Sequence, residues 1–315
     1  MDEFALIRQY FASLTKPAAD VALGIGDDCA LLQLPAGEVL AVSTDTLVSG
    51  RHFPVDTAPY DIGWKSLAVN LSDLAAMGAQ ARWFTLALTL PDADQSWIAE
   101  FARGLSDLSA ESSISLVGGD TTRGPLSITI TVMGSVPVSS ALKRNGARVD
   151  DVVCVTGTLG DAALALRVLN QPDLSSELRA RLDRPTPRLA AGLALRDVAS
   201  AAIDLSDGLA GDLAHVLQAS NAGAEIYSQR LPSSLAFKQR VSPDDSLELQ
   251  VQGGDDYELC FCIAPEKFDE AVARLAVIDV PLTLIGRITL EPGLRFLDAN
   301  GATIPLEPNG YRHFQ

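Results

Sequence analysis

Aspartates next to glycines are the residues of this sequence best suited to chemistry. They recur in the segments Gly26-Asp-Asp28, Ser43-Thr-Asp45, Asp73, Gly118-Gly-Asp120, Asp204-Leu-Ser-Asp-Gly208 and Gly253-Gly-Asp-Asp256. A single segment of this kind is typical of a turn, in which glycine supplies a positive φ and aspartate caps the backbone. Several of these aspartates, however, follow directly on predicted strands. Because ligand sites of α/β proteins gather at the carboxyl ends of strands, the repeated pattern predicts a binding site.

Carboxylates that converge repel one another, so they are stable together only when cations neutralise them. Oxygen ligands without His or Cys favour Mg²⁺, Mn²⁺ or Ca²⁺ over zinc, and the spacing of an EF-hand calcium loop is missing. Magnesium uses few carboxylates per ion and completes its shell with water and phosphate. Scattered single aspartates therefore fit several Mg²⁺ ions that clamp a nucleotide polyphosphate for phosphoryl transfer.

Covalent catalysis has little support in the sequence. The chain has three histidines and no Gly-x-Ser-x-Gly elbow, so we expect no covalent nucleophile. It also lacks a Gly-x4-Gly-Lys-Ser/Thr loop, a complete dinucleotide fingerprint and a His-Arg-Asp kinase loop. Among the basic residues, Arg144 is equally consistent with a surface salt bridge and with a phosphate contact.

Composition restricts the partners and the compartment. A formal net charge of −16 disfavours binding to nucleic acid or to anionic lipid. The N-terminus lacks the order of charges of a signal peptide, and no apolar run approaches the roughly 18 residues that a membrane helix needs. The four cysteines are too scattered for a disulfide scaffold, and Cys260 and Cys262 fit a buried strand. We expect a reduced cytoplasmic enzyme.

The elements that must position the aspartates alternate between helices and strands in both halves, which predicts an α/β fold with mixed sheets. The predicted helices cover 3–14, 60–77, 92–109, 161–170, 186–199, 207–219 and 265–276, and the predicted strands 38–44, 82–90, 114–117, 126–132, 152–156, 201–205, 257–263, 282–289 and 294–297. Ser66, Asn70 and Asp73 form a polar stripe on one helix. A polar segment at 143–151 is the predicted boundary between domains 1–143 and 144–315.

A series of motifs resembles the bacterial thiamine-monophosphate kinase family from Phe4 to about Phe314. The motifs are Gly24-Ile-Gly-Asp-Asp-Cys-Ala30, Ser43-Thr-Asp-Thr-Leu47, His52-Phe53, Ala68-Val-Asn-Leu-Ser-Asp-Leu-Ala-Ala-Met-Gly-Ala79, Gly118-Gly-Asp-Thr-Thr-Arg-Gly124, Ile203-Asp-Leu-Ser-Asp-Gly208 and Gly253-Gly-Asp-Asp-Tyr-Glu-Leu259. The resemblance implies the two-domain fold of aminoimidazole ribonucleotide synthetase. Domain 1–143 would bind ATP and Mg²⁺, and its sheet would form a barrel across a homodimer. Domain 144–315 would complete the active-site cleft.

The same resemblance implies the reaction and its residues. The ATP γ-phosphoryl group would pass directly to thiamine monophosphate, giving thiamine diphosphate and ADP in the last step of thiamine diphosphate biosynthesis, with several Mg²⁺ ions as cofactors. The metal ligands would be Asp28, Ser43, Thr44, Asp45, Asp73, Asp120, Asp204 and Asp207; the nucleotide contacts Gly119, Asp120, Arg144 and Ser206; and the substrate contacts His52, Asp255 and Tyr311. Many relatives carry Glu at the position of Asp255, which leaves Asp256 or a bridging water as alternative contacts.

Other functions remain open from the sequence. A different ATP-dependent enzyme of the same superfamily is one, although selenophosphate synthetase needs a reactive Cys or selenocysteine within a segment where this chain has none. A non-catalytic Mg-nucleotide sensor is another, and it could dispense with acids near the γ-phosphate. A structural acidic protein would use its aspartates only in turns, and nucleotide would then not stabilise it in a Mg²⁺-dependent way.

Overall fold

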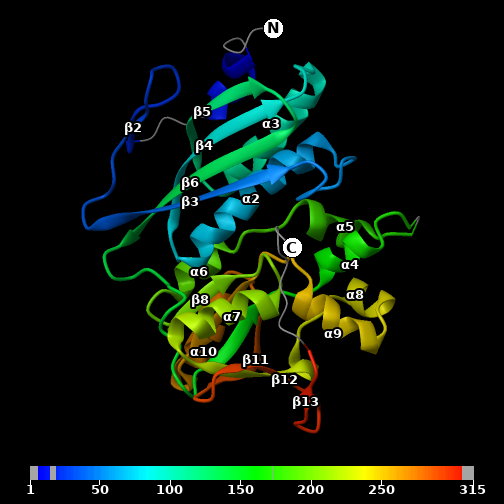
Figure 1. Cartoon of the computed structure of the whole chain (residues 1–315). Helices are drawn as coiled ribbons and strands as arrows, with labels where there is room; N and C mark the ends of the chain where they lie inside the picture. The colour runs from blue at the N-terminus through cyan, green and yellow to red at the C-terminus, as the bar shows by residue number, and fades with distance from the viewer. Residues whose placement is uncertain (1–5, 15–18, 172, 307–315) are drawn as a thin grey trace. The chain divides into compact units, whose positions relative to one another are not determined.

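The chain forms two compact units, each built on a mixed sheet with helices against it (Figure 1). The structure is a computed structural model that describes residues 6–14, 19–171 and 173–306. The first unit comprises the chain up to Leu74 together with Ala79–Ser139, and the second comprises Ala75–Gly78 and the chain from Ser140 onward. The predicted mixed α/β architecture is confirmed, whereas the exact boundary between residues 143 and 144 stays a prediction.

The first unit contains a sheet with the order β3-β6-β4-β5. Its strands are β3 (Glu38–Val48), β4 (Gln80–Leu90), β5 (Ser115–Arg123) and β6 (Ser127–Pro137). β6 runs antiparallel to both β3 and β4, and β4 and β5 are parallel. Helices α2 (Pro59–Ala76) and α3 (Gln95–Glu111) lie along one face of this sheet (Figure 1). Shorter elements are η1 (Ile7–Phe11), η2 (Ala12–Leu14), β1 (Val21–Leu23) and β2 (Leu31–Leu32).

The two faces of the first sheet have different chemistry. In β6 the side chains of Ile128, Ile130 and Val132 are fully buried, while the intervening threonines point to the opposite face, as the period of two of a strand requires. On that opposite face the hydroxyls of Thr44 and Thr131 form a hydrogen bond of 2.8 Å. Thr46 and Thr129, two residues farther along their strands, form a second bond of the same length. We call this threonine-bearing side the open face; the helices cover the other.

The second unit contains a sheet with the order β13-β12-β9-β11-β7-β10-β8. Its strands are β7 (Val152–Thr156), β8 (Ala201–Asp204), β9 (Gly223–Tyr227), β10 (Leu259–Ile263), β11 (Leu282–Thr289), β12 (Gly293–Leu297) and β13 (Thr303–Ile304). Its helices are α4 (Asp161–Arg167), α5 (Ser176–Asp183), α6 (Leu189–Leu195), α7 (Leu209–Ser220), α8 (Leu235–Arg240), α9 (Pro243–Gln252) and α10 (Phe268–Ala276), with short turns η3 (Ser228–Arg230) and η4 (Pro265–Lys267).

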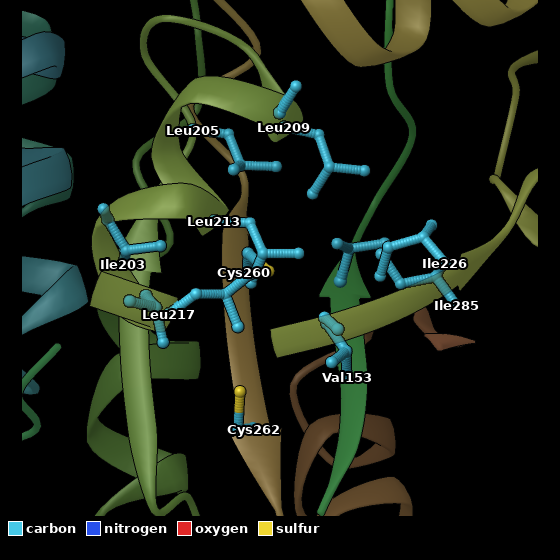
Figure 2. Close-up of a cluster of buried hydrophobic side chains, with 14 of the residues drawn as sticks. Val153, Ile203, Leu205, Leu209, Leu213, Leu217, Ile226, Cys260, Cys262 and Ile285 are labelled. Carbon is cyan, nitrogen blue, oxygen red and sulfur yellow. The ribbon is translucent and has the colours of Figure 1, made fainter. Parts of the chain in front are cut away.

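Apolar side chains cover both faces of the second sheet. On one face, Leu209, Leu213 and Leu217 of α7 pack on side chains of the central strands, among them Cys260 (Figure 2). On the other face, residues of α6 and α10 pack around Phe261. A third cluster joins α4, α5, α8 and α9. Strands buried on both faces read as continuous apolar runs, and the predicted burial of Cys260 and Cys262 is confirmed.

Four elements expected from the sequence differ from those of the structure. The strands expected to end at residues 44 and 117 continue to Val48 and Arg123, because pairing with the neighbouring strands β6 and β4 extends along these polar segments. Asp45 and Asp120 therefore lie within strands and not at their ends. The helix expected over 186–199 begins only at Leu189, since two prolines at 185 and 187 precede it. The N-terminal helix expected over 3–14 is, within the described residues, a π-helix (η1) followed by a 3₁₀ helix (η2) in place of a regular α-helix.

Four elements of the second unit are not predicted by the sequence patterns, namely α5, β9, α8 and α9. No helix in the described part of the chain combines the length and the apolar character needed to span a membrane.

A pair of glycines sets the distance between α2 and α3. A Cβ atom added to Gly63 would lie 2.1 Å from the carbonyl oxygen of Phe101, and one added to Gly104 would lie 2.0 Å from that of Tyr60. We predict that Gly104→Ala lowers the unfolding free energy of the first unit by about 1–3 kcal/mol, the usual range for overpacking. Helix propensity alone predicts the opposite sign, a gain of about 1 kcal/mol.

Urea denaturation followed by tryptophan fluorescence measures this effect, because Trp64, Trp83 and Trp97 are the only tryptophans of the sequence and all belong to the first unit. Ser106→Ala on the same helix is the control, with an expected change below about 1 kcal/mol. A Gly104→Ala protein as stable as the parent would contradict close backbone packing at this position.

Candidate functional site

In the first unit, β3 and α2 bring one group of predicted site residues together. The hydroxyl of Ser43 donates a 2.5 Å hydrogen bond to Oδ2 of Asp73, and the backbone N–H of Asp45 donates to Oδ1 of Asn70 at 2.9 Å. Ser43 and Asp45 share a face of β3 because they are two residues apart, and that face meets α2. The Ser43 hydroxyl and the Asp73 carboxylate are therefore in contact, and Asn70 of the same helix holds the backbone of Asp45.

The polar stripe predicted on α2 supports this site through hydrogen bonds from buried side chains. Asn70 and Ser66 are completely buried. The Asn70 side chain uses its oxygen for β3 and its Nδ2 for the carbonyl of Ser66, at 3.0 Å, so both ends are hydrogen bonded. The Ser66 hydroxyl donates to the carbonyl of Ile62 in its own helix. The stripe thus acts mainly as a support that fixes the position of β3.

The other predicted residues of the first unit lie apart from this group. Thr44 and Asp120 belong to the open face of the sheet, Asp120 in register with Ala87. Gly119 is required there because a Cβ would lie 1.9 Å from the carbonyl oxygen of Leu86. Asp28 is exposed in the loop after β1. His52 accepts a hydrogen bond from the backbone N–H of Val48 at Nδ1, 3.0 Å away.

In the second unit, two loops carrying predicted site residues are hydrogen bonded to each other. Asp204 is the last residue of β8, the loop that follows it contains Ser206 and Asp207, and the loop between α9 and β10 contains Gly253–Glu258. Asp255 N–H donates to the carbonyl of Ser206 at 2.9 Å, and Tyr257 N–H donates to that of Leu205 at 2.8 Å. These bonds align the two loops like a short pair of strands. The spacing of Ser206 from Asp255 is therefore fixed by backbone contacts.

Glycines permit this close approach. A Cβ on Gly254 would lie 2.5 Å from the carbonyl oxygen of Ser206, and one on Gly208, where φ is 101°, would lie 2.9 Å from the backbone carbon of Gln252. The glycines of both sequence motifs thus have a packing reason as well as a conformational one.

Asp212, which the sequence reading missed, shapes the first of these loops. Its Oδ2 accepts hydrogen bonds from the backbone N–H groups of Ser206 and Asp207, both at 3.0 Å. Burial and the nearby charges of Asp204 and Asp207 raise the pKa of Asp212 to about 7, although the two backbone hydrogen bonds oppose the shift. Its position in the first turn of α7, five residues after Asp207, is the signal that could have identified it.

Asp256 and Glu258 point inward and do not present carboxylates at the surface. Asp256 is 2% exposed and accepts the Gly160 N–H at 2.9 and 3.1 Å. Burial raises the pKa of Asp256 well above its usual range, against the opposing charge of Arg181. This burial disfavours Asp256 as a substrate contact. Asp255, between the two glycines and Asp256, is half-buried and reaches the surface of the loop.

Glu258 forms the centre of a buried ionic cluster. Arg188 binds it through two nitrogens, at 2.6 Å each, Arg181 donates at 2.9 Å, and the Thr156 hydroxyl donates at 2.7 Å. Burial by itself would raise the pKa of Glu258, but the hydrogen bond from Arg188 and the two guanidinium charges lower it below its usual value. Because Glu258 is the last residue of the loop that carries Asp255, its bonds to Arg181 and Thr156 anchor that loop to α5 and β7.

The remaining predicted residues are less constrained by the structure. Arg144 is exposed, and its carbonyl accepts a hydrogen bond from Ser220. Tyr311 lies outside the described residues. Within the described part of the chain, no three His, Cys, Asp or Glu side chains are grouped as a ready-made metal site. The aspartates instead form small separate groups, each of which could bind a cation only together with water or a ligand.

Comparisons with known proteins identify the family of the chain. The sequence models of the AIR synthase related protein family match residues 26–136 for the N-terminal domain and 148–298 for the C-terminal domain. The chain is 47% identical to the thiamine-monophosphate kinase of Escherichia coli K12, over 99% of this chain and 98% of that protein. It is 33% identical to the enzyme of the same name from Bacillus subtilis, over the whole of both.

Solved structures give the same result. The thiamine-monophosphate kinase of Stenotrophomonas maltophilia has a TM-score of 0.89 at 48% identity, covering 96% of this chain and 98% of that one. AaThiL, solved in complex with AMPPCP and TMP, has a TM-score of 0.78 at 30% identity, covering 92% of each chain. On these grounds the chain belongs to the thiamine-monophosphate kinase family.

Proposed function

We propose that this chain transfers the γ-phosphoryl group of ATP to thiamine monophosphate, producing thiamine diphosphate and ADP. The observation that carries the proposal is the similarity to thiamine-monophosphate kinases along the full length of both chains, 47% identity in the Escherichia coli enzyme. A relative at 30% identity has been solved with AMPPCP, an ATP analogue, and with TMP. The alternatives of another acceptor and of a nucleotide sensor become outcomes of the experiment below.

Magnesium is part of the proposal, and the donor groups suit it. Ser43 and Asp73, already joined at 2.5 Å, offer a hydroxyl and a carboxylate, which are hard oxygen ligands. Asp28, Thr44, Asp45 and Asp120 would add ligands in the first unit, and Asp204 and Asp207 in the second. Separate small groups of oxygens leave room for phosphate oxygens and water, as Mg²⁺ prefers. When bound, these ions would neutralise the charge of the polyphosphate.

We assign the organic ligands to the remaining residues. Gly119 and Asp120, together with Arg144 and Ser206, would hold the nucleotide phosphates. His52, Asp255 and Tyr311 would contact thiamine monophosphate. The thiazolium ring of this substrate is a cation, so the carboxylate of Asp255 and an aromatic face such as that of Tyr311 suit it chemically.

The reaction needs no covalent intermediate on the protein. An oxygen of the substrate phosphate attacks the γ-phosphorus in line with the bond to the ADP leaving group. That oxygen is ionised at neutral pH, so no side chain has to act as a general base. The chain's own task is to orient both phosphates and to exclude water, for which rigid loops such as that of Asp255 are suited.

A homodimer completes the proposal. In β3, which pairs with β6 at the edge of the described sheet, Leu40 is 47% exposed and Val42 is 56% exposed. A long edge strand that carries apolar side chains usually has a partner. Together with the open face, it offers a surface on which a second sheet could form a barrel. Domains 1–143 and 144–315 remain our proposed division.

The direct test is a reaction of the purified chain with ATP, Mg²⁺ and thiamine monophosphate, followed by phosphorus NMR. We expect thiamine diphosphate and ADP in equal amounts, and no reaction after EDTA is added. ADP with inorganic phosphate alone would indicate an ATPase with another acceptor. Nucleotide binding without turnover would indicate a sensor.

Neutralising single carboxylates tests the metal assignment. We expect Asp45→Asn, Asp73→Asn and Asp120→Asn each to lower kcat by about 100-fold or more, the usual scale for losing a group that stabilises transition-state charge. Melting temperatures should change little, because each substitution keeps the shape of the side chain. Asp92→Asn, an exposed aspartate of the first unit, is the matched control. Normal turnover in all three variants would refute the assignment.

The pKa of about 7 for Asp212 predicts a pH-dependent magnesium requirement. Below this pH Asp212 holds a proton and adds no negative charge to the loop; above it, the ionised carboxylate attracts cations to Asp204 and Asp207. The Mg²⁺ concentration that gives half the maximal rate should therefore decrease as the pH rises from 6 to 8. Asp212→Asn stays neutral and can still accept the backbone hydrogen bonds, so its requirement should change less over the same range. Identical pH profiles would contradict the prediction.

A further inference from the structure

The side chains of Tyr257 and Asp255 form a hydrogen-bonded pair within a single loop. The Tyr257 hydroxyl donates to Oδ1 of Asp255 at 3.0 Å. Tyr257 is buried, with 9% of its surface exposed, whereas Asp255 is half-buried. The phenol is therefore held by packing, and the carboxylate that it contacts lies where a ligand could reach it.

The backbone of this loop adopts an uncommon conformation that makes the contact possible. Asp255 and Tyr257 both have left-handed values of φ, 68° and 48°, which aspartate adopts more readily than a bulky residue such as tyrosine. Such a conformation persists only when the surroundings enforce it, and it is concentrated at functional sites. Here the Asp256 side chain is fixed by Gly160, and the N–H groups of residues 255 and 257 bond to the neighbouring loop.

We propose that Tyr257 is a positioning residue that orients the Asp255 carboxylate toward thiamine monophosphate. The inference rests on the proposed role of Asp255 in binding this substrate. The aspartate side chain is short and only partly exposed, so its direction decides which ligand group it can contact. Since a carboxylate repels the substrate phosphate, the favourable partners are the cationic thiazolium ring and the amino group of the pyrimidine.

Tyr257→Phe tests this role because it removes only the hydroxyl. We expect the KM for thiamine monophosphate to rise about tenfold, the scale of one hydrogen bond to a charged group. The kcat and the KM for ATP should stay within about twofold, because the variant leaves the groups assigned to ATP in place. Tyr227→Phe in β9 is the matched control and should leave all three values unchanged; its ring lies under Arg230.

A double-mutant cycle distinguishes positioning from general support. When Asp255→Ala has already removed the carboxylate that accepts the bond, adding Tyr257→Phe should raise the KM for thiamine monophosphate much less than tenfold. Full additivity, or an unchanged KM in Tyr257→Phe, would overturn the inference while leaving the proposed reaction intact. A parent protein that forms no thiamine diphosphate would instead refute the proposed function.

A second substitution covers the case in which Tyr257→Phe does not fold. p-Aminophenylalanine at position 257 keeps the ring and replaces the O–H donor by an N–H donor. Its KM for thiamine monophosphate should stay within about threefold of the parent value, given a donor of similar strength. A tenfold rise in this folded protein would contradict positioning by the donor.

Discussion

Repulsion between carboxylates is the constraint on which the arrangement of this protein depends. The chain carries 40 acidic residues against 24 lysines and arginines, and its acidic motifs lie close to one another in the loops of the second unit. The structure relieves the repulsion with local donors. Asp73 receives a hydroxyl, Asp212 receives two backbone N–H groups, and Glu258 receives two guanidinium groups. Different donors thus stabilise different carboxylates, and Arg181 serves both Glu258 and the neighbouring Asp256.

This arrangement separates two kinds of acid that look alike in the sequence. Asp256 and Glu258 are buried and stabilise the fold, whereas Asp255, which directly precedes Asp256, is half-buried. The difference arises from the left-handed backbone at residues 255 and 257, which turns the intervening side chain inward. One tetrapeptide therefore contributes both an anchor and a surface carboxylate. The paired loop at 204–208 is fixed by the same hydrogen bonds, so the two loops form one rigid element.

The sequence predicted the class of fold, most strands and the approximate helices of the first unit, because alternation and helical periodicity were regular there. It located α2 and its polar stripe almost to the residue. It did not predict that Asp45 and Asp120 lie inside strands, since a β-strand can continue through polar threonines when one of its faces is open. Nor did it identify Asp212 or the arginines around Glu258. Asp212 bonds to the nearby Ser206 and Asp207, whereas the roles of the arginines depend on contacts between segments distant in sequence, such as Arg188 with Glu258, which no local pattern records.

The order of strands in the second sheet has a consequence for synthesis on the ribosome. β7 is the first strand of this unit to emerge, and its partners are β10 and β11, which follow roughly 100 residues later. At ordinary rates of translation, β7 therefore waits about 5–20 s before either of its edges is paired. The sheet of the first unit is complete once β6 has emerged. During this interval a nascent chain would carry a finished N-terminal sheet together with an apolar strand whose two edges are unpaired. Protection by a chaperone would matter most at this stage of synthesis.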